Sequence, residues 1–129
     1  MKKITIFLIT ALIITILGSV IYSATAAYVK ITPQEAKRIM DSGKPYILVD
    51  VRTDSEYKEN HIQGAVLIPD YSIAGNAESA LPDKNEVILV YCRSGGRSAN
   101  AAKILIDLGY TNVFDFGGIL SWPYETISL

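Results

Sequence analysis

Short apolar runs alternate along this chain with polar stretches that open with helix-capping residues. Five of these runs have the length and apolar character of buried strands, at residues 29–31, 46–51, 65–68, 87–90 and 112–116. Most of them lack the strict alternation of a half-exposed strand, so both faces of each strand should be covered. The pattern predicts an α/β protein with a mostly parallel, five-stranded sheet and helices on both faces.

The segments between the runs contain start and stop patterns for helices. Residues 32–35, Thr-Pro-Gln-Glu, combine a capping box with proline at the first helical position, and this helix should end near Ser42. Residues 53–56, Thr-Asp-Ser-Glu, repeat the capping box and open a short helix. A third helix is predicted over residues 98–108, whereas residues 70–81 contain glycine and asparagine and are predicted as a short link.

The only cysteine, Cys92, follows the fourth apolar run and precedes the third helix. Ligands of parallel sheets bind at the carboxyl ends of the strands, where this thiol should lie. Between Arg93 and Arg97, Gly95 and Gly96 can adopt left-handed backbone angles and turn successive N–H groups toward the sulfur. These donors, the helix N-terminus and the two guanidinium groups favour a thiolate, which is a nucleophile for anionic substrates.

Three segments resemble the rhodanese-like sulfurtransferases. Residues 92–97, Cys-Arg-Ser-Gly-Gly-Arg, match the family's loop Cys-x-x-Gly-x-Arg. The family's N-terminal signature is similar to residues 50–52, 56–57 and 61–65, the last of which read His-Ile-Gln-Gly-Ala. Its C-terminal signature is similar to residues 113–122. Because the three segments occur in the expected order, the resemblance covers nearly the whole chain beyond its N-terminus.

The resemblance implies a sulfurtransferase in which Cys92 attacks the outer sulfur of a donor such as thiosulfate and carries it as a persulfide. The implied substrate-binding residues are those of the loop, Arg93, Ser94, Gly95, Gly96 and Arg97. No cofactor and no metal are expected. A single cysteine provides no internal resolving thiol, so the acceptor should be an external thiol or cyanide.

Two other functions stay open on the residues alone. A cysteine and an arginine around a helix N-terminus also suit a cysteine-dependent phosphatase or arsenate reductase. Those phosphatases have five residues between the cysteine and the arginine, whereas this chain has four, which favours a smaller cup for sulfur. A non-catalytic rhodanese-like binding module is the third possibility, although such modules usually lack the cysteine.

Other polar residues of these segments have structural interpretations. Asp50 and Arg52 flank the end of a buried strand and are predicted to form an ion pair that positions the loop. His61 should hydrogen-bond backbone in a turn, and Trp122 should pack in the core. The predicted link at residues 70–81 should leave one side of the loop open, which affects acceptor specificity but not the chemistry.

The N-terminus resembles an export signal. Lys2 and Lys3 precede an uncharged, strongly apolar stretch, and Ala24-Thr25-Ala26 has the spacing that signal peptidase recognises. Residues 1–26 are therefore predicted as a signal peptide or, if uncleaved, a membrane anchor, and residues 27–129 as one rhodanese-like domain. Either outcome places the domain outside the cytoplasm, in the periplasm or an equivalent compartment, with membrane contact only if the segment is retained.

Charge limits the range of partners. The chain has 12 basic and 13 acidic residues, and without residues 1–26 only the two lysines are lost, which leaves a net charge of about −3. A mildly acidic domain without a basic run is not suited to nucleic acid. The resemblance implies a small anionic sulfur donor as the ligand. The sequence makes no prediction about oligomeric state.

Overall fold

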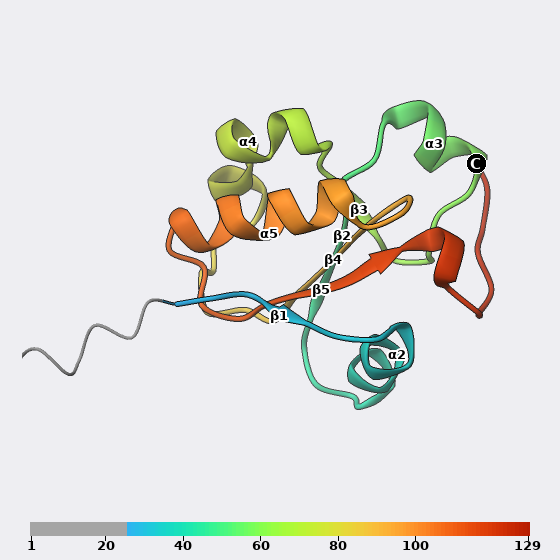
Figure 1. Ribbon diagram of the computed structural model, residues 1–129, viewed down its shortest axis with the longest axis horizontal. Coiled ribbons are helices and arrows are strands. Elements are labelled where there is room, and N and C mark those ends of the chain that lie inside the picture. The colour runs from blue at the N-terminus through green and yellow to red at the C-terminus, as the bar shows by residue number, and fades with distance from the viewer. Residues whose placement is uncertain (1–25) are drawn as a thin grey trace, which may run out of the picture.

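A five-stranded, all-parallel sheet forms the centre of the protein. The computed structural model describes residues 26–129, so the predicted export segment, residues 1–26, lies outside the described residues except for Ala26. The strands are β1 (Val29–Lys30), β2 (Ile47–Asp50), β3 (Val66–Leu67), β4 (Ile88–Cys92) and β5 (Val113–Gly118). Their order is β1-β5-β4-β2-β3 (Figure 1), which confirms the predicted sheet.

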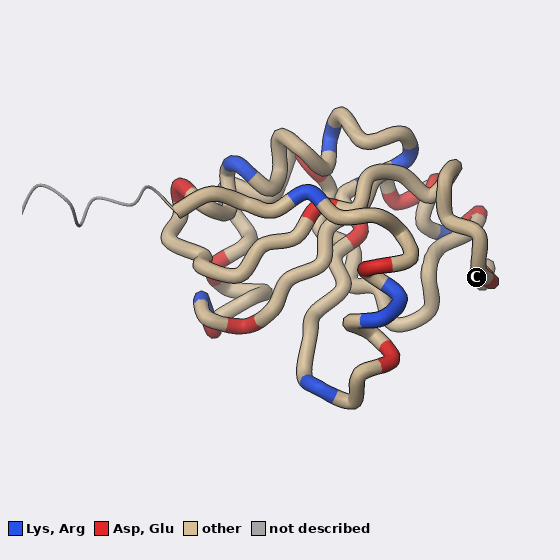
Figure 2. The backbone as a smooth tube through the Cα atoms, turned by 60° about the horizontal axis from the view of Figure 1, so that its bottom comes forward, with Lys and Arg blue, Asp and Glu red and all other residues tan. Residues whose placement is uncertain are grey.

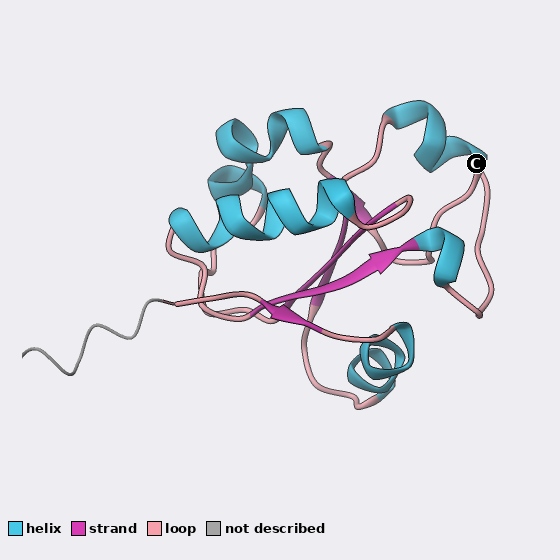
Figure 3. Ribbon diagram, viewed as in Figure 1, coloured by secondary structure: helices cyan, strands magenta, loops and turns pink. Residues whose placement is uncertain are grey.

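Helices cover both faces of the sheet, as predicted. They are α2 (Pro33–Asp41), α3 (Asp54–Glu59), α4 (Ile73–Ala80) and α5 (Gly96–Asp107), with 3-10 turns at Asp70–Ser72 and Ile119–Ser121. Helices α4 and α5 lie on one side of the strands and α2 on the other (Figures 1 and 3). In the part of the chain that the structure describes, no helix is long and apolar enough to cross a membrane.

Alternate residues of β4 point into two separate apolar layers. Val90 and Cys92 belong to the layer beneath α4 and α5, together with residues of those helices such as Ala77 and Leu105. Leu89 and Tyr91 belong to the opposite layer, against α2. The cysteine at the end of the central strand therefore lies on the α5 face of the sheet.

Both predicted capping boxes are present. At the start of α2, the Thr32 hydroxyl accepts the Glu35 N–H at 3.1 Å and the Glu35 carboxylate accepts the Thr32 N–H at 2.7 Å. At the start of α3, Thr53 and Glu56 make the same pair of bonds, at 3.3 and 2.9 Å. Each pair satisfies backbone donors that a helix N-terminus otherwise leaves free.

The predicted short link at residues 70–81 was wrong, because this segment is helical. A 3-10 turn at Asp70–Ser72 leads directly into the eight-residue helix α4. Ile73 and Ala77, which are fully buried, pack in the α5-side layer. Their burial outweighs the poor helix propensity of Gly75 and Asn76. This side of the domain is therefore covered by a helix.

Charges of both signs are interspersed along the described backbone (Figure 2). Several form exposed pairs, such as Lys37–Asp41 within α2, Lys58–Asp54 within α3 and Lys84–Glu78 near α4. Exposed pairs of this kind contribute little to stability, about 0–1 kcal/mol each.

Candidate active site

Cys92 is the last residue of β4, and the loop after it turns back over its sulfur. The Gly95 N–H donates a hydrogen bond to Cys92 Sγ at 3.0 Å. Gly95 has a φ of +114°, a conformation that side chains oppose, so glycine is required there as predicted. The same expectation for Gly96 was wrong, because Gly96 begins α5 and its φ is not positive.

A second polar group reaches the sulfur from α5. The hydroxyl of Ser98, which is fully buried, lies 3.5 Å from Cys92 Sγ and also within hydrogen-bond distance of the Gly95 and Gly117 carbonyl oxygens, at 3.1 and 3.3 Å. It thus links the strand end, the loop and β5 at one point. Ser98 was not among the site residues predicted from the sequence.

A pattern in the sequence could have found it. Ser98 shares the buried stripe of α5 with Ala101, Ala102 and Leu105, at the i, i+3, i+4 and i+7 positions. A hydroxyl on an otherwise apolar stripe, six residues after the cysteine, has to find a partner inside the protein.

The end of β5 packs closely against the backbone of the loop. A Cβ atom on Gly118 would lie 2.0 Å from the Arg93 carbonyl oxygen, so there is no room for a side chain. Next to it, the Gly117 N–H donates to Asp115 Oδ1 at 2.9 Å. Asp115 is fully buried, and its Oδ2 has no hydrogen-bond partner among the described residues. The loop is therefore held between α5 and the backbone of β5.

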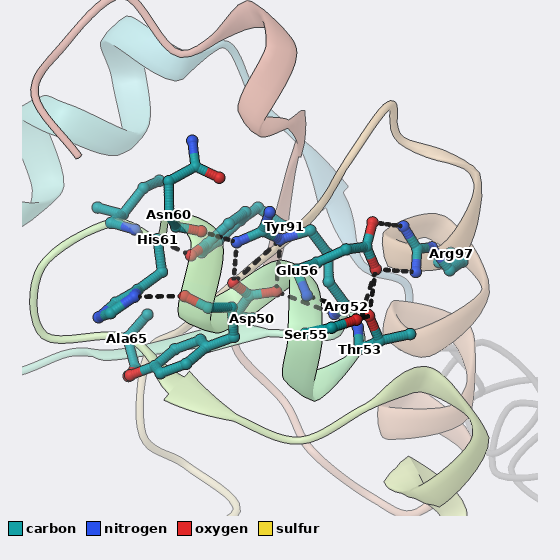
Figure 4. Close-up of polar contacts among 12 residues, drawn as sticks. Asp50, Arg52, Thr53, Ser55, Glu56, Asn60, His61, Ala65, Tyr91 and Arg97 are labelled. Atoms are coloured by element: carbon teal, nitrogen blue, oxygen red, sulfur yellow. Dashed lines mark hydrogen bonds and ion pairs between the residues drawn. The ribbon is translucent and has the colours of Figure 1, made fainter. Parts of the chain in front are cut away.

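Arg97 does not extend freely toward an incoming anion. Its Nη1 and Nη2 donate to the two carboxylate oxygens of Glu56, at 2.8 and 2.9 Å (Figure 4). The side chains are 31% and 23% exposed, so the pair lies at the surface of the site and is only partly shielded from water. The hydrogen bond from Arg97 lowers the pKa of Glu56 from 4.5 to about 2, and the same bond raises the pKa of Arg97. The sequence-based role of Arg97 did not include this partner.

Arg93, Ser94 and Gly96 are the exposed residues of the loop. Beside the loop is a pocket of about 410 Å³, lined by residues of both charges and by two apolar residues: Arg52, Glu56, Glu59, Asn60, Arg93, Ile119 and Leu120. The residues beside the loop are therefore mixed in charge, whereas the sequence indicated only the two arginines, Arg93 and Arg97.

The predicted structural pair Asp50–Arg52 is confirmed. Arg52 donates to Asp50 through Nε and Nη2, at distances from 2.8 to 3.1 Å, and both residues are buried. Arg52 also donates to the Asn60 carbonyl oxygen (Figure 4). A buried pair of this kind fixes the segment between β2 and α3, next to the active loop.

His61 and Trp122 also have the structural roles that the sequence indicated. The ring of His61 stacks on Tyr57 at 3.8 Å, and its Nδ1 bonds the Tyr57 carbonyl oxygen at 2.8 Å. Trp122 packs against Phe116 with ring centroids 5.5 Å apart. Among residues 26–129, the structure groups no three His, Cys, Asp or Glu side chains in a way that could hold a metal ion.

The arrangement places a buried sulfur atom at the N-terminus of a 12-residue helix, with an N–H donor and a hydroxyl in contact with it. Helix N-termini and inward N–H groups stabilise negative charge. The site is therefore suited to a sulfur nucleophile and to a small anion bound on it.

Comparisons with known proteins agree with this description. Residues 32–124 match the family of the rhodanese-like domain. The chain is 41% identical over 71 residues to the thiosulfate sulfurtransferase PspE of Escherichia coli K12. This alignment covers 55% of this chain and 68% of that protein. The chain is 36% identical over 97 residues to the thiosulfate sulfurtransferase GlpE of Haemophilus influenzae PittEE, which is 74% of this chain and 89% of that one.

Solved structures show the same fold. A rhodanese with anions from E. coli superposes with a TM-score of 0.62 at 34% identity, over 65% of this chain and 99% of that one. A rhodanese-like domain protein from Staphylococcus aureus superposes with a TM-score of 0.66 at 33% identity, over 78% of this chain and 98% of that one.

Proposed function

Because the chain belongs to the family of rhodanese-like domains, we propose that it is a thiosulfate-type sulfurtransferase that carries sulfane sulfur on Cys92. The family is the one that residues 92–97 indicated, and two relatives with the name thiosulfate sulfurtransferase align across most of their own length. The observation on which the proposal depends most is the contact of Cys92 Sγ with the Gly95 N–H at the start of α5.

The reaction has two steps. Cys92 thiolate attacks the outer sulfur of thiosulfate, the S–S bond of the donor breaks, and sulfite leaves with the electron pair. An acceptor thiolate or cyanide then attacks the outer sulfur of the persulfide, which regenerates the Cys92 thiolate. Sulfite is a stable anion, so its departure needs no proton and no general acid.

The loop supplies the groups that hold the anions. Gly95 and the first turn of α5, from Gly96, provide backbone N–H donors and the positive end of the helix, which suit a persulfide anion. Arg93 and Ser94 are exposed at the mouth, where a donor would approach. Arg97 adds positive charge that Glu56 partly offsets.

Intact-protein mass spectrometry tests the proposal. After exposure to thiosulfate, the wild-type domain should gain the mass of one sulfur atom and lose it on treatment with cyanide. The Cys92→Ser variant should show no gain. A persulfide on the serine variant, or none on the wild type with any sulfane donor, would contradict the mechanism, and efficient hydrolysis of an aryl phosphate through Cys92 would favour the phosphatase instead.

The acceptor is an external molecule in this proposal. Cys92 is the only cysteine of the chain, so no second thiol of the same molecule can take the sulfur. Small thiols, protein thiols and cyanide all have the required affinity for sulfane sulfur. Release of the bound sulfur by each of them can be followed by the same mass measurement.

We also propose that the domain, residues 27–129, is exported after loss of residues 1–26. The support is the lysine-flanked apolar run and the Ala24-Thr25-Ala26 spacing. N-terminal sequencing of the protein from its native compartment should begin at Ala27 or within two residues of it. An intact Met1 in the membrane fraction would favour the anchored form, and a soluble cytoplasmic form would contradict both.

A further inference from the structure

Glu56 is the residue of the active site whose chemistry the proposed reaction does not use. We propose that Glu56 determines donor specificity: by binding Arg97 it disfavours donors with two negative charges relative to donors with one. The inference rests on the proposed function, and it names the charge class of the donor that the site accepts best.

Glu56 holds Arg97 in a fixed position because its own carboxylate is fixed first. Oε2 accepts hydrogen bonds from the Thr53 N–H and the Thr53 hydroxyl, both at 2.9 Å, as part of the capping box of α3. The same oxygen accepts Arg97 Nη1, and Oε1 accepts Nη2 (Figure 4). A two-point contact of this kind sets both the position and the plane of the guanidinium group.

The charge of Glu56 persists throughout the neutral pH range. Its pKa of about 2, which the hydrogen bond from Arg97 causes, keeps the carboxylate ionised wherever the thiolate can react. Arg97 therefore meets an incoming anion as one member of an ion pair. The net attraction that the pair exerts on a second anion is much smaller than that of a free arginine.

The surrounding charges add to this effect. Glu59 lines the pocket beside the loop together with Glu56. The negative charge of Asp70 adds to that of Glu56 in raising the pKa of Arg97. Of the two arginines that line the pocket, Arg52 is bound to Asp50. Arg93 is thus the basic residue of the mouth that no ion pair in the described chain engages.

The second negative charge of a dianionic donor is consequently stabilised only weakly at the loop mouth. The persulfide formed on Cys92 has one negative charge, which the Gly95 N–H and the helix N-terminus can stabilise. A singly charged donor needs no more than these groups. A dianion such as thiosulfate would gain from an unpaired Arg97, and Glu56 removes that gain.

Two donors that differ by one charge test the inference. Thiosulfate is a dianion, and methanethiosulfonate is a monoanion with the same sulfane sulfur. Glu56→Gln removes the charge but keeps the size and an acceptor oxygen. It should raise the ratio of kcat/KM for thiosulfate to that for methanethiosulfonate about 3- to 10-fold, through KM, with kcat changed less than twofold.

The chain offers a matched control in the other capping box. Glu35→Gln changes the same motif at the start of α2, where no arginine binds the carboxylate at hydrogen-bond distance. Its donor ratio should equal that of the wild type. Glu56→Asp keeps the charge but shortens the side chain, so its ratio should change less than that of Glu56→Gln, even if kcat falls. An unchanged ratio in Glu56→Gln, or an equal change in either control, would overturn the inference.

A measurement without sulfur transfer separates this inference from the proposed function. Sulfate and methanesulfonate are unreactive anions with two charges and one, and calorimetry gives their dissociation constants. The ratio of the affinity for sulfate to the affinity for methanesulfonate should be about 3- to 10-fold higher in Glu56→Gln than in the wild type. This holds whether or not the wild type forms a persulfide. The same ratio of sulfate to methanesulfonate affinity in the wild type and in Glu56→Gln would overturn the inference. A missing persulfide alone would overturn only the proposed function.

Discussion

The N-termini of α2 and α3 have the same four-residue pattern and different roles. Each begins with Thr-x-x-Glu, and in each the threonine and the glutamate exchange hydrogen bonds as a capping box. Within residues 26–129, Glu35 accepts hydrogen bonds only from its own turn. Glu56 accepts the same bonds and in addition binds Arg97, 41 residues further along the chain.

The difference shows that a local motif, the capping box, can hold a side chain in the orientation needed to bind a residue far away in the sequence. In both turns the capping bonds fix the carboxylate at no further conformational cost. Only the turn of α3 faces the active loop, so only there does the fixed carboxylate act on a functional residue. Five predictions test this difference between the two turns, beginning with the strongest effect.

Arg97→Ala should have the largest effect. It removes a charged donor near the anion and leaves the Glu56 carboxylate without its partner at the mouth of the site. The unpaired carboxylate then repels the dianion, and a repulsion of about 1–2 kcal/mol should lower kcat/KM for thiosulfate about 5- to 30-fold. Steady-state kinetics with cyanide as the acceptor measure the change.

The double variant Glu56→Gln/Arg97→Ala shows how much of that loss is repulsion. Removing the unpaired carboxylate should restore part of the activity, because its charge no longer repels the dianion. No recovery in the double variant would mean that the charge of Glu56 does not act on thiosulfate.

Glu56→Ala should destabilise the fold by about 2 kcal/mol, because it removes charge-assisted bonds to Arg97 and to the helix cap. Glu35→Ala should destabilise it less, since the carboxylate of Glu35 is solvent-exposed and bonds only within its own turn. Urea unfolding curves of the two variants give both differences. Equal losses would mean that the contact with Arg97 contributes nothing to stability.

The stabilising effect of Glu56 should depend on pH. Its pKa in the folded protein is about 2, below the ordinary 4.5, because Arg97 and Thr53 bind the charged form. A depressed pKa gives stabilisation that is complete above pH 4.5 and is lost as the pH falls through about 2. The difference in unfolding free energy between wild type and Glu56→Gln should therefore shrink from pH 6 to pH 3, whereas parallel curves would contradict the pKa.

Thr53→Ala and Thr32→Ala should have the smallest effects. Each removes one capping hydroxyl, which destabilises a protein by about 1 kcal/mol. Thr53→Ala also loosens Glu56, so it should shift the donor ratio in the same direction as Glu56→Gln but by less than threefold. Thr32→Ala should leave the ratio unchanged, and a shift there would show that helix capping alone affects the site.

Features that depend on nearby residues could be predicted from the sequence. Both capping boxes, the Asp50–Arg52 pair and the place of Cys92 at the end of a buried strand follow from contacts between close neighbours. The parallel sheet also follows, because five apolar runs separated by helices have few other arrangements.

Features that depend on packing between distant segments could not be predicted from the sequence. Helix α4 contains Gly75 and Asn76, and its helical form results from the burial of Ile73 and Ala77 against α5. The Glu56–Arg97 bond requires α3 and the start of α5 to lie side by side, which no local pattern specifies. In both cases the deciding interaction is tertiary.

The strand order has a consequence for the synthesis of the protein. Strand β1 is the edge strand of the described sheet and pairs with β5, which is the last strand of that sheet to be made. While the ribosome adds the intervening residues, β1 has no neighbour to pair with and β4 keeps one edge open. Native pairing of the whole sheet therefore waits for residues 113–118, so the domain completes its fold late and is more exposed to aggregation until then.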